Sequence, residues 1–123
     1  MTLSEIAQEL VAGCREGRES ENLGKLYAAD AVSVEASDPM GMGRETKGLE
    51  GIRGKHEWWD GAFEVLEGNI EGPYEHGDDK FAVHFKMKTK SKESGEVSDM
   101  AEVGVYHVAD GKIVREEFFY TMG

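Results

Sequence analysis

The sequence predicts a single α+β domain in which three N-terminal helices precede a mostly antiparallel sheet. Two observations lead to this prediction. Apolar residues recur at helical spacing through most of the first half of the chain, whereas from Phe63 onward β-branched and aromatic residues form strand-like runs separated by turn residues. Helices that are segregated from antiparallel strands in this way are typical of α+β folds.

Length and charge narrow the class of protein. The chain has 123 residues and a formal net charge of −11, which is enough for one domain with a hydrophobic core but argues against nucleic acid or an anionic membrane as partner. Cys14 is the single cysteine, so a disulfide framework is excluded and a reducing compartment is favoured. The first residues lack the pattern of a signal peptide, and the apolar runs are too short to span a bilayer, so we expect a cytoplasmic protein.

The chain is predicted to begin with a helix that starts at a capping box formed by Thr2 and Glu5. Its apolar stripe consists of Ile6, Ala7, Leu10, Val11 and Cys14. We interpret Cys14 as a core residue in preference to a nucleophile, because an acid–base partner at an obvious spacing is missing. A second helix is predicted for residues 20–29 and a short strand for residues 31–36.

Residues 37–47 are the most irregular stretch, because two Gly, one Pro and two Met favour neither a helix nor a strand. Asp38 precedes Pro39, which favours an extended backbone at Asp38. Two interpretations of Asp38 remain open. It is either a turn residue that forms hydrogen bonds within its own loop or a functional carboxylate that the scaffold holds in place.

A third helix is predicted for residues 48–59. Its apolar stripe has a spacing of 3, 4, 3 and 4 residues and consists of Leu49, Ile52, His56, Trp59 and Phe63. His56 lies within this stripe, so it is either a satisfied core residue or a catalytic group that faces the interior. Strands are then predicted for residues 63–74, 80–90, 97–108 and 113–120, with Phe81, Val83, Phe85 and Met87 on one face of the second of them.

The turn between the last two strands leaves two registers open. A two-residue loop, Asp110-Gly111, would place Val103 opposite Phe118 and turn Glu102 and Glu116 to opposite faces of the sheet. A three-residue loop that starts at Ala109 would instead place Gly104 opposite Glu116 and bring both carboxylates to one face.

Three stretches resemble the SnoaL-like, ketosteroid-isomerase-like group of the nuclear-transport-factor-2-like superfamily. They are LYAADAVSVE at residues 26–35, DPMG followed by KGLEGI at residues 38–52, and VYHVADGKIV at residues 105–114. The resemblance covers essentially the whole chain. It implies a cone in which a strongly curved sheet wraps around three helices and encloses a deep apolar pocket, and it implies homodimerisation. The superfamily contains isomerases, cyclases, dehydratases and proteins without demonstrated chemistry.

The resemblance also suggests roles for individual residues. Asp38 resembles the base of the steroid isomerases, with two extra residues before it, whereas the positions of their two oxyanion donors correspond here to Leu10 and Gly104, which cannot donate. The isomerase hairpin corresponds to the three-residue loop. Glu102 and Glu116 would then face the pocket, where burial and like charge raise the pKa of a carboxyl group. The alternative is an outward-facing Glu102 or a glutamate paired with an arginine.

These considerations favour an enzyme without a cofactor that moves protons on a small apolar, carbonyl-bearing substrate. The expected catalytic residues are Asp38, Glu102, Glu116 and His56. The expected substrate-binding residues are Tyr120, Trp59, Phe118, Met40, Tyr106 and Phe85. Motifs for nucleotides or metals are missing, so we expect no metal site. Two alternatives remain: a pocket that only binds an apolar ligand, and a module that dimerises through the outer face of the sheet.

Overall fold

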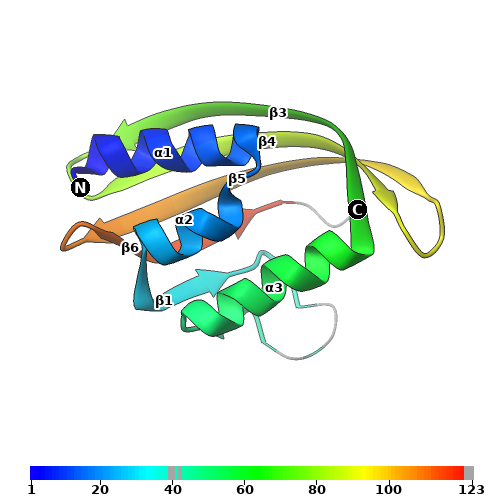
Figure 1. Cartoon of the computed structure of the whole chain (residues 1–123), viewed down its shortest axis with the longest axis horizontal. Helices are drawn as coiled ribbons and strands as arrows, with labels where there is room; N and C mark the ends of the chain where they lie inside the picture. The colour runs from blue at the N-terminus through cyan, green and yellow to red at the C-terminus, as the bar shows by residue number, and fades with distance from the viewer. Residues whose placement is uncertain (39–40, 42, 121–123) are drawn as a thin grey trace.

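A six-stranded sheet curves around three helices in the computed structural model, which describes residues 1–38, 41 and 43–120 (Figure 1). The strand order is β2-β1-β6-β5-β4-β3, and all neighbours are antiparallel except β1 and β6. The elements are α1 (Leu3–Glu16), α2 (Glu19–Leu26), β1 (Tyr27–Val34), β2 (Glu45–Lys47), α3 (Leu49–Ala62), β3 (Phe63–His76), β4 (Lys80–Ser91), β5 (Val97–Ala109) and β6 (Lys112–Phe119). This is the expected α+β cone. Within the described residues, every helix is too short or too polar to cross a membrane.

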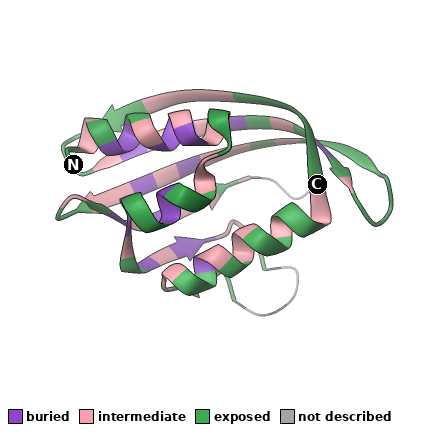
Figure 2. Cartoon of the chain, viewed as in Figure 1, coloured by how far each residue is buried: buried purple, intermediate pink, exposed green. Residues whose placement is uncertain are grey.

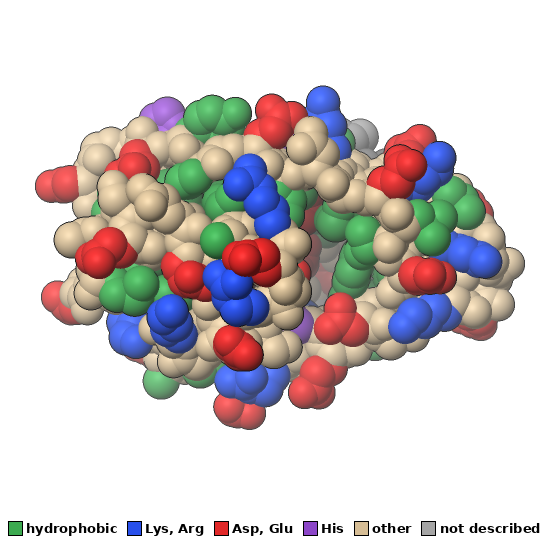
Figure 3. Space-filling view, turned by 45° about the horizontal axis from the view of Figure 1, so that its top comes forward, with side chains coloured by type: hydrophobic (Ala, Val, Ile, Leu, Met, Phe, Trp, Pro, Cys, Tyr) green, Lys and Arg blue, Asp and Glu red, His purple; other side chains and the backbone are tan. Residues whose placement is uncertain are grey.

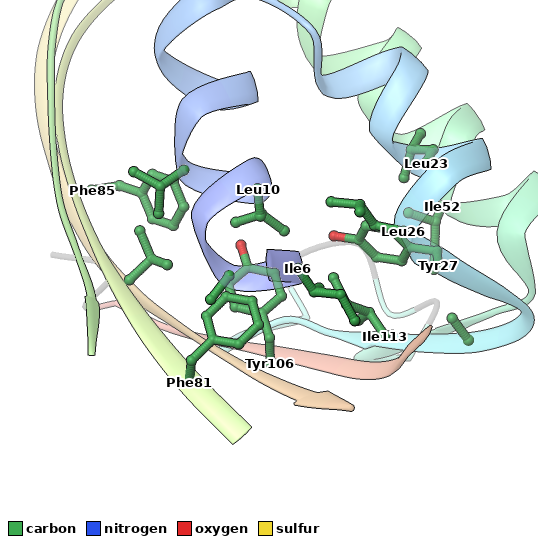
Figure 4. Packing of buried hydrophobic residues seen from close by; sticks show 14 residues of the cluster. Ile6, Leu10, Leu23, Leu26, Tyr27, Ile52, Phe81, Phe85, Tyr106 and Ile113 are labelled. Carbon is green, nitrogen blue, oxygen red and sulfur yellow. The ribbon is translucent and has the colours of Figure 1, made fainter. Parts of the chain in front are cut away.

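Helix α1 begins as predicted. The Thr2 side chain accepts a hydrogen bond from the Glu5 backbone while the Glu5 carboxylate accepts one from the Thr2 backbone. The apolar stripe of α1 is buried against the sheet, where it meets the inward side chains of β4, β5 and β6 (Figure 4). Figure 2 shows that burial is concentrated where α1 and α2 cover the middle of the sheet, whereas the tip of the β4–β5 hairpin is exposed.

Two predictions about the chain after α2 are wrong. The second helix ends at Leu26 and not at residue 29, because Tyr27 already pairs with Ile113 of β6 as the first residue of β1. The stretch 37–47 contains a short strand, β2, which pairs with the end of β1. Both differences come from pairing with distant strands, which local sequence preference does not report.

Helix α3 and strand β4 carry their predicted inward faces. Ile52 is fully buried, and the Trp59 ring lies 5.6 Å from the Phe63 ring, although α3 continues to Ala62, three residues further than expected. On β4, Phe81 and Val83 are fully buried. Strand β3 follows α3 directly and bends sharply before it runs alongside α1 (Figure 1).

The β5–β6 hairpin combines features of both predicted registers. Asp110 and Gly111 have φ values of +51° and +73°, and Ala109 pairs with Lys112, so the connection is the two-residue loop and the three-residue prediction is wrong. The ladder then shifts between the pairs Val108–Ile113 and His107–Arg115, which leaves Val114 as the extra residue of a β-bulge. Beyond this bulge the even-numbered residues of both strands share the interior face.

Candidate active site

The bulge determines which side chains face the helices. Beyond it, Tyr106 pairs with Glu116 and Gly104 pairs with Phe118 of β6. Along its other edge β5 pairs with β4, and there Glu102 lies opposite Phe85. The expectation that Gly104 lies opposite Glu116 is therefore wrong by two residues. Gly104 instead makes room for two aromatic rings, since a Cβ atom there would lie 3.0 Å from Cε2 of Tyr106 and 3.1 Å from Cε1 of Phe118.

Glu116 is the most deeply buried carboxyl group of the site, with only 2% of its surface exposed. Its Oε2 accepts a hydrogen bond of 3.3 Å from the Tyr27 hydroxyl, and its Oε1 has no hydrogen-bond partner among the described residues. Burial raises the pKa of Glu116 to about 7, against the opposing effect of Lys55 and the Tyr27 hydrogen bond. Both the protonated and the ionised forms are therefore populated at neutral pH.

Glu102 is half-buried on the same face of the sheet, two residues from Gly104. Burial, and after it the charge of Glu35, raises the pKa of Glu102 to about 7. Its strand neighbours are apolar on this face, because Phe85 lies directly across the ladder and Phe118 lies diagonally across it. The site therefore contains two carboxyl groups that can hold a proton near pH 7.

The two carboxyl groups do not form a dyad. Glu102 is four residues from Tyr106, the partner of Glu116, which corresponds to roughly 13 Å along a strand. Repulsion by Glu102 is accordingly the smallest of the causes that act on the pKa of Glu116, well behind burial. Of the two causes expected from the sequence, burial therefore dominates and like charge between Glu102 and Glu116 contributes little.

Lys55 places a positive charge in this interior. Its Nζ atom donates a hydrogen bond of 2.8 Å to Oγ of the fully buried Ser33 and forms an ion pair with Glu35. The other Glu35 oxygen accepts a hydrogen bond of 2.9 Å from the Tyr120 hydroxyl. Sequence reasoning missed Lys55 and Glu35. The one available signal was the position of Lys55 three residues after Ile52, on the edge of the apolar stripe.

A hollow opens between the helices and the bend of the sheet. Figure 3 shows it between the N-terminal helical part and the opposite end of the molecule, with apolar and acidic side chains along its walls. One pocket of about 410 Å³ lies between the end of α1 and β3, lined by Cys14, Arg15, Val65, Gly68, Asn69 and Ile70. The Cys14 thiol in this lining responds to the charge of Glu116. Burial raises the pKa of the Cys14 thiol to about 12, and the charges of Glu19 and Glu116 contribute to the same shift.

A larger pocket, of about 510 Å³, lies away from the buried carboxyl groups. It is lined by Val34, Gly43, Arg44, Glu45, Lys47, Arg115 and Glu117 around β1, β2 and β6. Val34, Arg115 and Glu117 are on the outer face of the sheet, because their neighbours Ser33 and Glu116 face inward. The size of this pocket does not make it the better site for an apolar substrate, since most of its lining side chains are charged.

The remaining predicted residues occupy different surroundings. Asp38 is exposed, and its Oδ2 accepts a hydrogen bond of 2.9 Å from the Gly43 backbone, as a turn residue would. His56 is half-buried, and burial followed by the charge of Lys55 lowers its pKa, so its imidazole is neutral at neutral pH. Met40 lies outside the described residues.

The predicted aromatic residues divide into two groups. Tyr106 and Phe85 are core residues, exposed by 3% and 8%, and the ring of Tyr106 stacks on that of Phe81. Figure 4 shows the hydroxyl ends of Tyr27 and Tyr106 pointing into this core. Trp59, Phe118 and Tyr120 are half-buried and therefore have surface that a ligand can contact. Among the described residues, no group of three His, Cys, Asp or Glu side chains could hold a metal ion.

Comparisons with known proteins agree with this geometry. A SnoaL-like domain model matches residues 1–120. The structure of a candidate SnoaL-like polyketide cyclase from Mesorhizobium loti is 40% identical, with a TM-score of 0.88 over 98% of this chain and 100% of that chain. Comparison with curated proteins gave no match.

Two mycobacterial structures share the fold at much lower identity. A Δ5-3-ketosteroid isomerase from Mycobacterium sp. is 17% identical, with a TM-score of 0.74 over 99% of this chain and 95% of that chain. A Mycobacterium tuberculosis protein in complex with estradiol-17β-hemisuccinate is 18% identical, with a TM-score of 0.77 over 99% of this chain and 96% of that chain. At these identities the likeness concerns the fold.

Proposed function

The chain belongs to the SnoaL-like family, and from this premise and the geometry of its interior we propose that it is an acid–base enzyme that needs no cofactor. Its substrate is a small, largely apolar compound with a carbonyl group, and the reaction is of the isomerase, cyclase or dehydratase type. The likeness to a candidate polyketide cyclase supports this class of substrate, because polyketides carry carbonyl groups.

The observation that carries the proposal is the state of Glu116. A carboxyl group that is 2% exposed, with one oxygen unpartnered among the described residues, is costly unless something uses it. Its pKa of about 7 is close to the optimum for a group that takes up a proton in one step and returns it in another. Tyr27 holds Oε2, which leaves Oε1 as the oxygen that receives the proton.

The chemistry requires few groups. Ionised Glu116 removes a proton from the carbon next to the substrate carbonyl, the C–H electron pair forms a C=C bond, and the carbonyl π electrons move to the oxygen. Glu116, now neutral, or Glu102 returns a proton at another position. Glu102 lies four residues along β5 from the strand partner of Glu116, so it serves a different end of the same substrate.

Hydrogen–deuterium exchange tests the proposal without knowledge of the natural substrate. Apolar ketones with acidic α-hydrogens are incubated with the protein in D₂O, and deuterium incorporation is followed by NMR. We expect Glu116→Gln to lower the catalysed exchange rate at least about 100-fold, because the base is lost. The control is Glu117→Gln on the same strand, whose side chain faces the outer side of the sheet. Equal exchange by wild type and Glu116→Gln would contradict the proposal.

A binding function without chemistry is the second candidate. It is favoured by Leu10 and Gly104, since neither side chain can supply the oxyanion donor that the steroid isomerases have at the corresponding position. A protein of this kind would bind apolar ketones, protect them from solvent and leave their α-hydrogens unexchanged. The same NMR experiment separates the two functions, because line broadening reports binding even where deuterium is not incorporated.

A further inference from the structure

The half-buried Lys55 side chain brings a cation to the interior, and its position is fixed from two sides. Lys55 projects from α3, and its Nζ atom contacts Ser33 and Glu35, both on or next to β1. Within residues 1–38, 41 and 43–120, these are its hydrogen-bonding partners. An ammonium group has three N–H donors, so one remains for a further acceptor.

The strand register shows where this remaining donor lies. Lys55 Nζ is 5.7 Å from the centroid of the Phe118 ring. Phe118 is two residues from Glu116 on the same face of β6, and it pairs with Gly104, which is two residues from Glu102 on β5. The ammonium group therefore lies over the part of the sheet that separates the two carboxyl groups.

We propose that Lys55 is a catalytic residue that stabilises the negative oxygen of the enolate formed from a neutral ketone substrate. This inference rests on the proposed function and deepens it. It supplies the donor that Leu10 and Gly104 cannot provide. Glu35 and Ser33 hold the ammonium group in place, and the Tyr120 hydroxyl holds Glu35.

The charges favour a neutral substrate over an anionic one. Lys55 and Glu35 form a neutral pair, so an uncharged ketone can enter without leaving a cation unpaired. When Glu116 takes the α-proton, its own negative charge disappears as the enolate oxygen becomes negative beside Lys55. The net charge of the site is unchanged during the step, and the charge moves toward a preorganised donor in a partly buried environment.

The charged and titratable groups around Lys55 are consistent with this role. Glu35 is its direct partner, and Glu102, Glu116 and His56 all respond to its charge. Lys55 lowers the pKa of both glutamates and, after burial, that of His56. His56 is consequently neutral and does not compete as a second cation, which leaves Lys55 as the group that favours a negative oxygen.

Binding of 4-nitrophenol tests the inference independently of turnover. Its phenolate resembles an enolate, because both place a negative oxygen on an sp² carbon, and only the ionised form absorbs visible light. We expect wild type to bind the phenolate in preference to the phenol. Lys55→Met should weaken phenolate binding about 10- to 100-fold, as expected for loss of a charge-assisted hydrogen bond. Lys55→Arg should restore part of it.

Two controls separate a lost donor from a damaged pocket. Nitrobenzene has no ionisable oxygen, so its affinity should be the same for wild type and Lys55→Met. Arg53→Met removes a cation from the same helix, one that pairs with Glu50, and should leave phenolate binding unchanged. Failure of wild type to bind the phenolate, or equal binding by wild type and Lys55→Met, would overturn the inference.

Failure of the inference and failure of the proposed function give different results. Glu116→Gln should retain or strengthen phenolate binding, since it removes a competing negative charge, while it abolishes deuterium exchange. Exchange that survives Glu116→Gln would count against Glu116 as the base and leave the role of Lys55 standing. Exchange that needs Glu116 but survives Lys55→Met at the full rate would count against Lys55 alone.

Discussion

The Tyr27 hydroxyl donates a hydrogen bond of 3.3 Å to Oε2 of Glu116, two buried residues from the parallel strands β1 and β6. This contact joins the beginning of the first strand to the middle of the last, across 89 positions of the sequence. It also divides the two carboxylate oxygens into one that the protein holds and one that is left for other partners.

The pH dependence of stability should reveal the buried state of Glu116. Burial raises its pKa from 4.5 to about 7, so between these pH values the folded protein retains a proton that the unfolded chain has lost. The stabilisation that Glu116 contributes through its retained proton is therefore complete below about pH 4.5 and is lost as the pH rises to about 7. The difference corresponds to about 3 kcal/mol of unfolding free energy.

Glu116→Gln removes this pH-dependent penalty and keeps an oxygen that can accept from Tyr27. We expect the variant to be more stable than wild type by up to about 3 kcal/mol at pH 8, with the difference shrinking toward zero at pH 4.5. Urea denaturation at both pH values measures it. A variant that is less stable than wild type at pH 8 would show that Glu116 is ionised and well solvated in the folded protein.

Tyr27→Phe should change the titration of Glu116 in a defined direction. The Tyr27 hydrogen bond favours the ionised carboxylate, so its loss should raise the pKa of Glu116 further. NMR of the carboxyl carbons measures this shift, and the lost hydrogen bond should cost about 1 kcal/mol of stability. Tyr74→Phe is the matched control, because Tyr74 is 50% exposed. An unchanged or lowered Glu116 midpoint would contradict the hydrogen bond.

Gly104 tests the packing behind the site. An added Cβ atom would lie 3.0 to 3.2 Å from atoms of the Tyr106 and Phe118 side chains, closer than ordinary contact. Gly104→Ala should therefore destabilise the protein by about 1–3 kcal/mol. Gly24→Ala on α2 has nothing within 4 Å of the new atom and should be neutral or stabilising, by up to about 1 kcal/mol. Chemical denaturation of both variants gives the comparison, and equal stabilities would argue against tight packing at Gly104.

The helices, the inward face of β4 and the existence of the last hairpin follow from local patterns. The capping box at Thr2 and the alternation from Phe81 to Met87 each have a physical reason within a few residues of sequence. The β-bulge at Val114 has no such local signal in the sequence. Neither hairpin register considered from the sequence has a bulge within β6, and this bulge changes the parity of β6 after a two-residue loop.

The candidate site could be predicted from the sequence only in part. Glu102 and Glu116 attract notice because carboxylates are unusual in apolar strands. Lys55 and Glu35 look like ordinary surface charges, because periodicity describes where apolar residues lie and does not identify charged residues that reach the interior at the edge of a stripe. Their pairing joins a helix to the residue that follows β1, 20 positions away, and it depends on how α3 lies against β1.

The outer face of the sheet leads to a prediction about assembly. Phe119 is 52% exposed, and Val103, its partner across the β5–β6 ladder, is half-buried on the same outward face. Tyr74, which is 50% exposed, pairs with Ala82. Ala82 in turn pairs with Val105, which is two residues from Val103 on β5. We expect a second copy of the chain to cover these side chains in a homodimer, because apolar surface in a contiguous group favours association.

Phe119→Asp should dissociate this dimer, since it would place two like charges near a two-fold interface while leaving the interior face of β6 unchanged. Light scattering at high micromolar concentration measures the mass. We expect about twice the 13.6 kDa of the chain for wild type and for the control Val97→Asp, whose site lies at the far end of β5, and 13.6 kDa for Phe119→Asp. The net charge of −11 opposes association only weakly at physiological salt, where screening acts over about 8 Å. A wild-type mass of 13.6 kDa would therefore refute the dimer and could not be attributed to charge repulsion.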